Sequence, residues 1–557
     1  MLEGMVPFPP EFAQRYRERG YWKDKSLAEE FDVVFKRYSD RVAVIDGNRS
    51  FTYADVDRLS SNLALNLLAA GLRPLDRVVV QLPNVAEFVI LYFGLQKMGA
   101  IPIAALTLHR YAEISQFVAL SGATACVIPD RQGDFEYVPM IRRIRGESPS
   151  LKYGIVHGSA PEGFLSLADL ISTPPQSAPS ALNEIRIDPG TAAVFQLSGG
   201  TTGIPKLIPR THNDYAYNSK VAAEVCEITG ESILLLVLPI AHNMPLACPG
   251  IQGFFFKGAK VVVSTSTKPE DMCALIEKHS VTHLKVVPAL LIRLLNDPVM
   301  NDPAIKRDLS SLQTIQSGGQ RLQPETRLLA KRLIPSAFIQ ENFGMSEGLL
   351  TFVRRNDPED VRLETVGKPV SLDDEVRLVD DDDTVVPLGE VGEMCCRGPY
   401  TLRGYYGVPE YNARVFSSDG FFHSGDLMRQ HSSGAFIVEG RKKDVINRGG
   451  EKISAEEVEN LILSHPKVKN TVCIAVPDPL MGERMCACVI LRDGMSLRFD
   501  ELKIFLVDKE IAKYKLPERL EILQDFPLST FGKVSKKQLV ETISAKIEKE
   551  TEKHARA

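Results

Sequence analysis

The chain has 557 residues, of which 44% are hydrophobic and 25% are charged. These ordinary proportions exclude collagen-like, disordered and disulfide-scaffold proteins, and the length exceeds what one hydrophobic core supports. The formal net charge is only −5, from 66 basic and 71 acidic residues. A broad basic face for nucleic acid is therefore not expected, although a local basic pocket for phosphates remains open.

The cysteine spacing and the length of the apolar runs predict where in the cell the protein is found. Cys395 and Cys396 are adjacent, and Cys486 and Cys488 lie two apart, so neither pair among the nine cysteines has zinc-site spacing. Free thiols in a reducing cytoplasm are expected. The first residues lack the basic and apolar regions of a signal peptide, and the longest apolar run, residues 233–241, is too short to span a bilayer. We expect a soluble, cytoplasmic protein with no membrane partner.

Short β-branched runs alternate with helical patterns from about residue 77. Continuous apolar runs, typical of strands buried on both faces, occupy residues 77–83, 100–106 and 124–130. A second series of strand-like segments follows at residues 192–198, 232–239, 259–265, 282–288, 312–318 and 337–344. Between the first two runs, residues 85–98 predict a helix with Phe88, Leu91 and Leu95 on one face. The alternation indicates an α/β fold with mostly parallel sheets covered by helices.

The pattern changes after Thr365. Strand-like segments flank the acidic turn Asp380–Asp383, which predicts an antiparallel β unit with a solvated turn and no calcium site. Residues 454–457 read as a capping box that opens a helix. The 114 residues after Lys443 are enough for a small α+β domain. We therefore divide the chain into residues 1–442 and 443–557.

The strongest local signal is residues 197–212, LSGGTTGIPKLIPRTH. Paired glycines, threonine hydroxyls and Lys206 make a donor-rich loop that suits phosphate oxygens. The Gly-Lys-Ser/Thr ending of a Walker A loop is missing. Taken alone, the segment also fits an ordinary glycine- and threonine-rich turn.

Further motifs support a nucleotide site. Residues 342–347 place an aromatic ring and a carboxylate at a strand's carboxyl end, where α/β sheets bind ligands and where a carboxylate can hold Mg²⁺. Residues 422–426 offer another carboxylate on a turn, suited to ribose hydroxyls. Residues 440–444 and 532–534 are short and weak alone.

Together, in this order, the motifs resemble the adenylate-forming superfamily of acyl- and aryl-CoA synthetases, peptide-synthetase adenylation domains and luciferases, over essentially the whole chain. Within it, residues 6–22, 197–220, 241–250 and 446–460 are similar to the stand-alone aryl acid–AMP ligases of siderophore synthesis. The resemblance implies a large N-terminal domain of two helix-covered, mostly parallel sheets plus a small β-barrel-like unit, followed by a small mobile α+β C-terminal domain.

The resemblance also implies the reaction and its residues. An aryl carboxylate attacks the α-phosphorus of ATP with Mg²⁺, and a phosphopantetheine thiol of an aryl carrier protein, or coenzyme A, then takes the acyl group. The resemblance implies that the ATP phosphates are bound by Ser198, Gly199, Gly200, Thr201, Thr202, Gly203 and Lys206. It implies that the nucleoside is bound by Gly319, Asn342, Phe343, Asp426 and Arg441. Glu347 matches the family's Mg²⁺ ligand, and Lys533 matches the lysine that bridges the carboxylate and the α-phosphate. His242 matches the residue that gates the acyl pocket beside the α-phosphate. Lys443 lies at the hinge of the C-terminal domain.

The implied acid pocket contains His242, Asn243, Met244, Cys248, Gly318 and Leu350. In the resembling ligases, the asparagine bonds an ortho-hydroxyl. Cys248 stands where dihydroxybenzoate ligases carry serine and salicylate ligases carry cysteine, and a thiol is the weaker partner for a 3-hydroxyl. Leu350 also fills space there, so we expect salicylate. Met244 replaces the usual aromatic residue, which leaves an amino- or heteroaryl acid open.

Four alternatives remain. Within the ligases, these are a 2,3-dihydroxybenzoate–AMP ligase and an aryl- or heteroaryl-CoA ligase that uses free coenzyme A. Outside them, a phosphotransferase would release ADP, and a nucleotide-binding regulator would have lost catalysis. The joint presence of Glu347, Asp426 and Lys533 speaks against the regulator.

Overall fold

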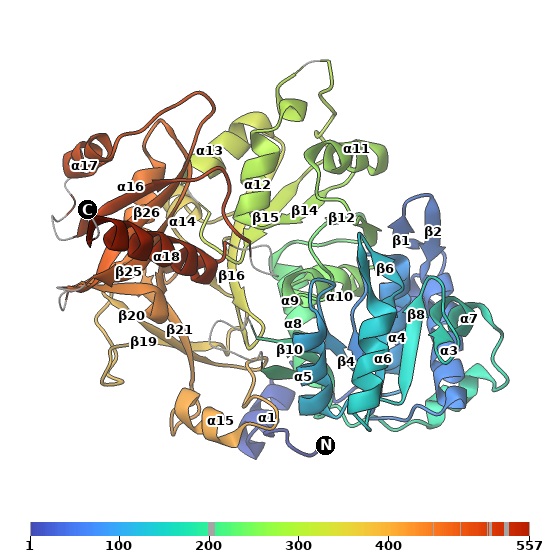
Figure 1. The fold of residues 1–557 in the computed structure, drawn as a ribbon. Helices are drawn as coiled ribbons and strands as arrows, with labels where there is room; N and C mark the ends of the chain where they lie inside the picture. Colours follow the sequence, from blue (N-terminus) through green and yellow to red (C-terminus); the bar gives the residue numbers. More distant parts are fainter. Residues whose placement is uncertain are drawn as a thin grey trace.

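The computed structural model describes residues 2–198, 206–302, 304–322, 324–448, 451–478, 481–509, 511, 515–528 and 534–555. Its strands form two large mixed sheets, a four-stranded antiparallel sheet and a five-stranded C-terminal sheet (Figure 1). Within these residues, no helix is both long enough and apolar enough to pass through a lipid bilayer. The α/β class predicted from the sequence is confirmed.

The first large sheet has seven strands, in the order β11-β10-β4-β3-β5-β8-β9. They are β3 (Arg77–Val80), β4 (Ile101–Ala104), β5 (Ala125–Pro129), β8 (Tyr153–His157), β9 (Leu165–Ser166), β10 (Ala192–Leu197) and β11 (Leu207–Thr211). All neighbours are parallel except β10 and β11. The fourth predicted run, residues 192–198, therefore joins the first sheet.

The second large sheet has nine strands, in the order β18-β17-β16-β15-β14-β12-β13-β1-β2. They are β1 (Val42–Asp46), β2 (Arg49–Thr52), β12 (Ile233–Leu236), β13 (Lys260–Val263), β14 (His283–Val286), β15 (Thr314–Gly318), β16 (Phe338–Met345), β17 (Gly348–Phe352) and β18 (Lys368–Pro369). Its centre is parallel and both of its ends are antiparallel.

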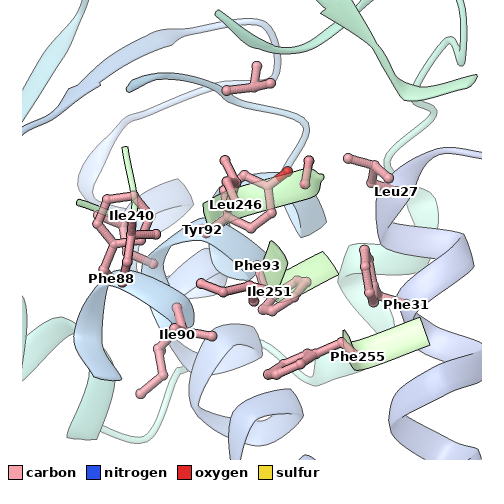
Figure 2. Close-up of a cluster of buried hydrophobic side chains, with 14 of the residues drawn as sticks. Leu27, Phe31, Phe88, Ile90, Tyr92, Phe93, Ile240, Leu246, Ile251 and Phe255 are labelled. Carbon is pink, nitrogen blue, oxygen red and sulfur yellow. The ribbon is translucent and has the colours of Figure 1, made fainter. Parts of the chain in front are cut away.

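Helices fill the space between the sheets and cover their outer faces. The inner layer includes α2 (Leu27–Arg37), α3 (Tyr53–Ala70), α4 (Ala86–Lys97), α8 (His212–Val225), α9 (Asn243–Ala247) and α10 (Gly250–Phe256), whose side chains meet in one apolar cluster (Figure 2). Outer helices are α5 (Tyr111–Ser121) and α6 (Tyr137–Glu147) on the first sheet, and α11 (Pro269–His279), α12 (Pro288–Leu295) and α13 (Pro324–Leu333) on the second.

Helix α4 lies at the boundaries predicted for it, but its burial differs from the one-sided pattern. Eleven of its twelve residues are buried, because it packs between the sheets instead of on a surface. Gly94 allows close contact with α3: a Cβ there would stand 3.1 Å from the Ser60 carbonyl oxygen. The helix thus ties the two sheets into one core.

The remaining helices before residue 442 are peripheral. They are α1 (Pro10–Glu18), α7 (Leu167–Ser172), α14 (Glu359–Glu364) and α15 (Pro409–Val415), with the 3₁₀ turns η1 (Pro179–Glu184) and η2 (Pro298–Met300). A two-residue hairpin, β6 (Arg131–Gln132) and β7 (Phe135–Glu136), stands apart from the sheets.

The predicted antiparallel unit is a four-stranded sheet, formed by β19 (Glu375–Val379), β20 (Val391–Arg397), β21 (Phe422–Gln430) and β22 (Phe436–Arg441). The acidic turn lies between β19 and β20, where the Asp380 carboxylate accepts hydrogen bonds from the backbone N–H groups of Asp382 and Thr384, both at 2.9 Å. This is the turn that the sequence predicts.

The C-terminal elements follow the 3₁₀ turn η3 (Lys442–Asp444). They are β23 (Val445–Arg448), β24 (Glu451–Ser454), α16 (Ala455–Leu463), β25 (Val468–Asp478), β26 (Gly482–Leu491), α17 (Phe499–Asp508), β27 (Arg519–Ile522) and α18 (Lys536–Ala555). They enclose a separate apolar cluster and lie across the molecule from the first sheet (Figure 1). Ser454 caps α16 by accepting from the Glu457 N–H, but the Glu457 carboxylate binds Lys515, so the predicted capping box forms only in part.

Candidate active site

The turn between β16 and β17 brings three distant parts of the chain together. The Met345 carbonyl accepts a bond from the Asn243 amide at 3.4 Å, and the Ser346 carbonyl accepts one from Arg210 at 3.1 Å. The backbone N–H of Leu402 donates to the Glu347 carbonyl at 2.7 Å. The predicted acid pocket and the predicted Mg²⁺ ligand therefore meet at one turn, beyond the carboxyl end of a central strand.

Glu347 lies in a partly buried, charged environment. Tyr405 donates its hydroxyl hydrogen to the carboxylate at 2.8 Å. Burial raises the pKa of Glu347, while the Tyr405 bond and the charge of Arg441 oppose that rise. The Lys206 ammonium lies 3.9 Å from the centre of the Tyr411 ring; burial lowers the pKa of Lys206, and the charge of Glu347 opposes this. A partly buried carboxylate with a raised pKa suits a divalent cation, which would favour its charged form.

Asp426 and Arg441 are cross-strand partners on β21 and β22, as their register requires. Arg441 Nε lies 2.8 Å from Asp426 Oδ1, and the Asp426 carboxylate is buried. The charge of Asp426 is the main cause of the raised pKa of Arg441. Both residues influence Glu347 electrostatically, so these three predicted residues share one electrostatic environment.

Gly318, Asn342 and Phe343 lie at the ends of β15 and β16. Gly318 pairs with Asn342, and a Cβ on Gly318 would come within 2.7 Å of the Asn342 side-chain amide. Glycine is therefore required there for the amide to keep its place. Gly319 follows with φ +87°, a left-handed conformation that favours glycine. Phe343 is partly buried against an apolar cluster that includes Met394 and Phe422.

Four of the six predicted acid-binding residues lie in α9 or at its ends, and the other two, Gly318 and Leu350, lie on β15 and β17. His242 is its N-cap, and Asn243 and Cys248 are buried at its two ends. The Tyr215 hydroxyl donates to the side-chain oxygen Oδ1 of Asn243 at 2.8 Å, which fixes the orientation of that side-chain amide. Met244 is half-buried.

Cys248 and Leu350 are both almost fully buried, with 2% and 1% of their surface exposed. The Asn218 amide donates to the Cys248 sulfur at 3.4 Å. Burial raises the pKa of the Cys248 thiol, which therefore stays protonated at neutral pH. The Leu350 N–H donates to the Tyr400 hydroxyl at 3.3 Å, which fixes the β17 backbone.

Sequence reasoning missed a buried polar group beneath these residues. Arg210 is fully buried, paired with Asp214 at 3.0 Å, and donates to the Tyr400 carbonyl at 3.1 Å. Asp214 and Asn218 lie four residues apart on α8, and their spacing could have placed them on one side of it; Arg210 precedes the helix on β11, and nothing in the sequence showed the burial of the three.

Lys285 on β14 was also missed. Its ammonium group donates to the Cys248 carbonyl and is fully buried, and burial lowers its pKa to about 8. The signal was present in the sequence, since a lysine interrupts the apolar run of residues 282–288. A charged residue inside a buried strand calls for a partner, and here a backbone carbonyl provides it.

Several predicted residues fall outside the described part of the chain. They are Gly199, Gly200, Thr201, Thr202, Gly203 and Lys533. The two residues that bound the phosphate loop are described: Ser198 donates its backbone N–H to the Lys206 carbonyl at 3.0 Å, and its hydroxyl accepts the Lys206 N–H at 2.9 Å. Lys443, the predicted hinge, lies in η3.

Comparisons with known proteins find similarity over nearly the whole chain. Residues 31–406 match the family model for AMP-binding enzymes, and residues 457–533 match the model for the AMP-binding enzyme C-terminal domain. The chain is 43% identical to 2,3-dihydroxybenzoate-AMP ligase of Bacillus subtilis (strain 168), with 98% of this chain and 99% of the relative covered.

Two further relatives are named for salicylate, a different aryl acid. A Streptomyces salicylyl-CoA synthase / salicylate adenylyltransferase is 42% identical, with 98% of both chains covered. The salicyl-AMP ligase / salicyl-S-ArCP synthetase of Mycobacterium tuberculosis is 39% identical, with 97% of this chain and 94% of the relative covered. Among solved structures, Mycobacterium smegmatis MbtA without ligand superimposes with a TM-score of 0.74 at 40% identity, covering 97% of this chain and 98% of that one.

Proposed function

The chain belongs to the AMP-binding enzyme family, and we propose that it activates salicylate as salicyl-AMP and passes the salicyl group to the phosphopantetheine thiol of an aryl carrier protein. At the coarser level it is an adenylate-forming ligase for aryl acids that uses ATP. The finer proposal, with its acceptor and its place in siderophore-type synthesis, rests on the site and on the relatives' names.

The adenylation step needs positioning and charge. A salicylate carboxylate oxygen attacks the α-phosphorus of ATP, a new P–O bond forms, and the bond to the bridging oxygen breaks to release pyrophosphate. No covalent enzyme intermediate is formed, so the protein must align the reactants and neutralise charge. We assign charge neutralisation at the phosphates to Lys206 and Lys533, and the ribose to Asp426, which Arg441 holds in place at 2.8 Å.

The residues present fit the Mg²⁺ that the family implies. Glu347 would hold the ion, since its burial leaves a carboxylate whose charged form a cation would favour. When bound, Mg²⁺ supplies charge neutralisation for the triphosphate. The Tyr405 hydroxyl fixes one carboxylate oxygen of Glu347 at 2.8 Å, which orients the group before the ion arrives.

The preference for salicylate rests on one observation: the thiol of Cys248 is buried and already bonded by the Asn218 amide at 3.4 Å, and the buried Leu350 belongs to the same apolar cluster. The Asn218 amide already bonds its sulfur, and a thiol is a weak partner for any further hydroxyl. A 3-hydroxyl placed there would lose its water without a strong replacement. For the ortho-hydroxyl the case is different, because Tyr215 fixes the Asn243 amide and a side-chain amide nitrogen carries two N–H donors.

Acid-dependent exchange of labelled pyrophosphate into ATP tests the proposal. We expect the highest kcat/KM with salicylate, a lower value with 2,3-dihydroxybenzoate and anthranilate, and no ADP. A preference for 2,3-dihydroxybenzoate would favour the activity named for the Bacillus relative, and ADP formation would overturn adenylation altogether. Transfer from salicyl-AMP to a phosphopantetheinylated carrier protein, compared with free coenzyme A, decides the acceptor.

A further inference from the structure

A thiol, an imidazole and a carboxylate meet on the outside of the four-stranded sheet, apart from the residues assigned above. Cys395 on β20 and His423 on β21 are cross-strand partners, and Cys395 Sγ lies 3.3 Å from His423 Nδ1. Asp383, from the acidic turn, places Oδ1 3.7 Å from His423 Nε2. One potential ligand atom from each of the three lies within 4.8 Å of the other two.

The two His423 distances involve different ring nitrogens, of which one ion can bind only one, and the candidate ligand set is one atom from each residue within 4.8 Å of the others. Bond lengths of about 2.3 Å to sulfur and about 2.0 Å to nitrogen or oxygen put tetrahedral ligand atoms roughly 3.3–3.6 Å apart. The thiol–imidazole distance already lies at that value. The carboxylate has to move inward, and it can, because Asp383 belongs to a turn and its side chain is 49% exposed.

Burial is graded across the three residues. Cys395 is fully buried, the His423 side chain is 22% exposed and that of Asp383 is 49% exposed. An ion would therefore enter from the solvent side and meet the sulfur at the bottom. The same exposure leaves room for a water molecule as a fourth ligand, the arrangement of an open zinc site.

The surrounding charges favour a divalent cation. Glu393 is already engaged, since its carboxylate accepts from the Gly425 N–H at 3.1 Å and from the Lys442 ammonium at 3.0 Å. A Cys395 thiolate and the Asp383 carboxylate would then balance an ion of charge +2. Glu393 Oε2 also lies 3.7 Å from His423 Nδ1, so the group has a second carboxylate beside it as well as the Lys442 ammonium.

We propose that Cys395, His423 and Asp383 bind one zinc-class divalent cation. The metal–sulfur bond forms as the thiol proton passes to solvent, a ring nitrogen of His423 donates its lone pair, and Asp383 supplies one oxygen. A set of one sulfur, one nitrogen and one oxygen selects zinc over Mg²⁺ or Ca²⁺, which take oxygen ligands. The bound ion connects the acidic turn to β20 and β21. Its ligand His423 lies three residues before Asp426.

The site differs from the Mg²⁺ site proposed at Glu347. Its three residues come from the small sheet and its turn, and no step of adenylation uses them. The proposal therefore stands or falls separately from the function proposed above. Sequence spacing gave no hint of it, because the ligands are separated by 12 and 28 residues and come together only through strand pairing.

Titration of tag-free, chelator-treated full-length protein with Zn²⁺ and with Co²⁺ tests the proposal. We expect one equivalent of each to bind, a thiolate-to-cobalt charge-transfer absorption, and a zinc-dependent rise in Tm. Millimolar Mg²⁺ should not displace the ion, and Glu347→Gln should bind zinc like the wild type. Failure of the wild type to show the charge-transfer absorption would overturn the proposal.

Matched variants assign the ligands. Cys395→Ser should abolish the absorption, whereas Cys396→Ser, which alters the adjacent buried thiol in a separate apolar cluster, should retain it. Asp383→Asn changes only an exposed turn and should fold normally, with zinc affinity lowered tenfold or more and the Tm rise reduced. Full retention of binding in both Cys395→Ser and Asp383→Asn would show that zinc binds elsewhere and would end the proposal.

Discussion

The acid side and the nucleotide side of the candidate active site are built differently. On the acid side, Asn243, Cys248 and Leu350 are almost fully buried and held by neutral hydrogen bonds to Tyr215, Asn218 and Tyr400. On the nucleotide side, Glu347 is partly buried and Arg441 is exposed, both are charged, and opposite charges act on each.

The difference indicates how each side works. A packed, neutral surface distinguishes acids by shape and by single hydrogen bonds, which are worth about 1–3 kcal/mol each. A charged surface acts on the developing charge of the reaction, where one group is commonly worth 10²- to 10³-fold in rate. Changes on the nucleotide side should therefore have large effects for every acid, and changes on the acid side should have small effects that depend on the acid.

The largest effect is expected from Glu347→Gln. The neutral amide keeps the shape and a hydrogen bond to Tyr405 but removes the charge proposed to hold Mg²⁺. We expect pyrophosphate exchange to fall roughly 10³-fold for all acids, with a higher Mg²⁺ requirement. Glu364→Gln, an exposed carboxylate on α14, is the control. A loss that differs between salicylate and 2,3-dihydroxybenzoate would contradict the division into two sides.

A somewhat smaller effect is expected from Lys533→Ala. Adenylation should fall about 10²-fold, since the ammonium is proposed to neutralise charge between carboxylate and α-phosphate. Transfer from supplied salicyl-AMP to a carrier thiol should change much less, because the C-terminal domain is proposed to rotate between the steps. The exposed Lys537→Ala is the control. Equal losses in both half-reactions would refute the role of Lys533.

The two sides also differ in how far the sequence predicted them. The sequence predicted a carboxylate at a strand's carboxyl end around Glu347 and another on a turn around Asp426. Glu347 lies in the turn between β16 and β17, whereas Asp426 lies within β21 and not on a turn. Nine strands of the two large sheets were predicted from their strand-like runs. The seven others, β1, β2, β8, β9, β11, β17 and β18, were not predicted. Assignment of residues 192–198 to the first sheet was not, since pairing across a long crossover leaves no local pattern.

The supports of the acid pocket were predicted poorly. Arg210 is a polar residue on β11, and Asp214 and Asn218 are polar residues on α8; local sequence does not distinguish a buried polar group from a solvated one. Lys285 was visible as an interruption in an apolar run, but its partner, the Cys248 carbonyl, is a backbone atom 37 residues away. Backbone partners carry no sequence signal.

The substitution Lys285→Met tests, through the pH dependence of folding stability, whether the acid side of the site is dry. Burial lowers the pKa of Lys285 to about 8 from its ordinary 10.5, so between these values the unfolded chain binds more protons than the folded one, and folding stability rises with pH. The methionine variant lacks this term. Relative to it, the wild type should gain about 2 kcal/mol between pH 8 and pH 10, seen as a growing difference in Tm. Exposed Lys278→Met on α11 should show no such trend, and a flat difference for Lys285→Met would mean that the lysine is not held in a dry environment.

The smallest effect, and the one most specific to the acid side, is expected from Cys248→Ser. A serine hydroxyl in place of the thiol offers an oxygen to the 3-hydroxyl of 2,3-dihydroxybenzoate, which otherwise enters a pocket closed by Leu350 with no strong partner. The unpaired hydroxyl costs about 1–3 kcal/mol, so the ratio of kcat/KM for salicylate over 2,3-dihydroxybenzoate should fall roughly tenfold. Adding Leu350→Val makes room and should lower the ratio further. Cys273→Ser alters a buried thiol in the separate cluster beneath α11 and should leave the ratio unchanged. If Cys248→Ser lowers both values equally and keeps the ratio, the thiol contributes packing alone, and selectivity must come from Met244 or another part of the pocket.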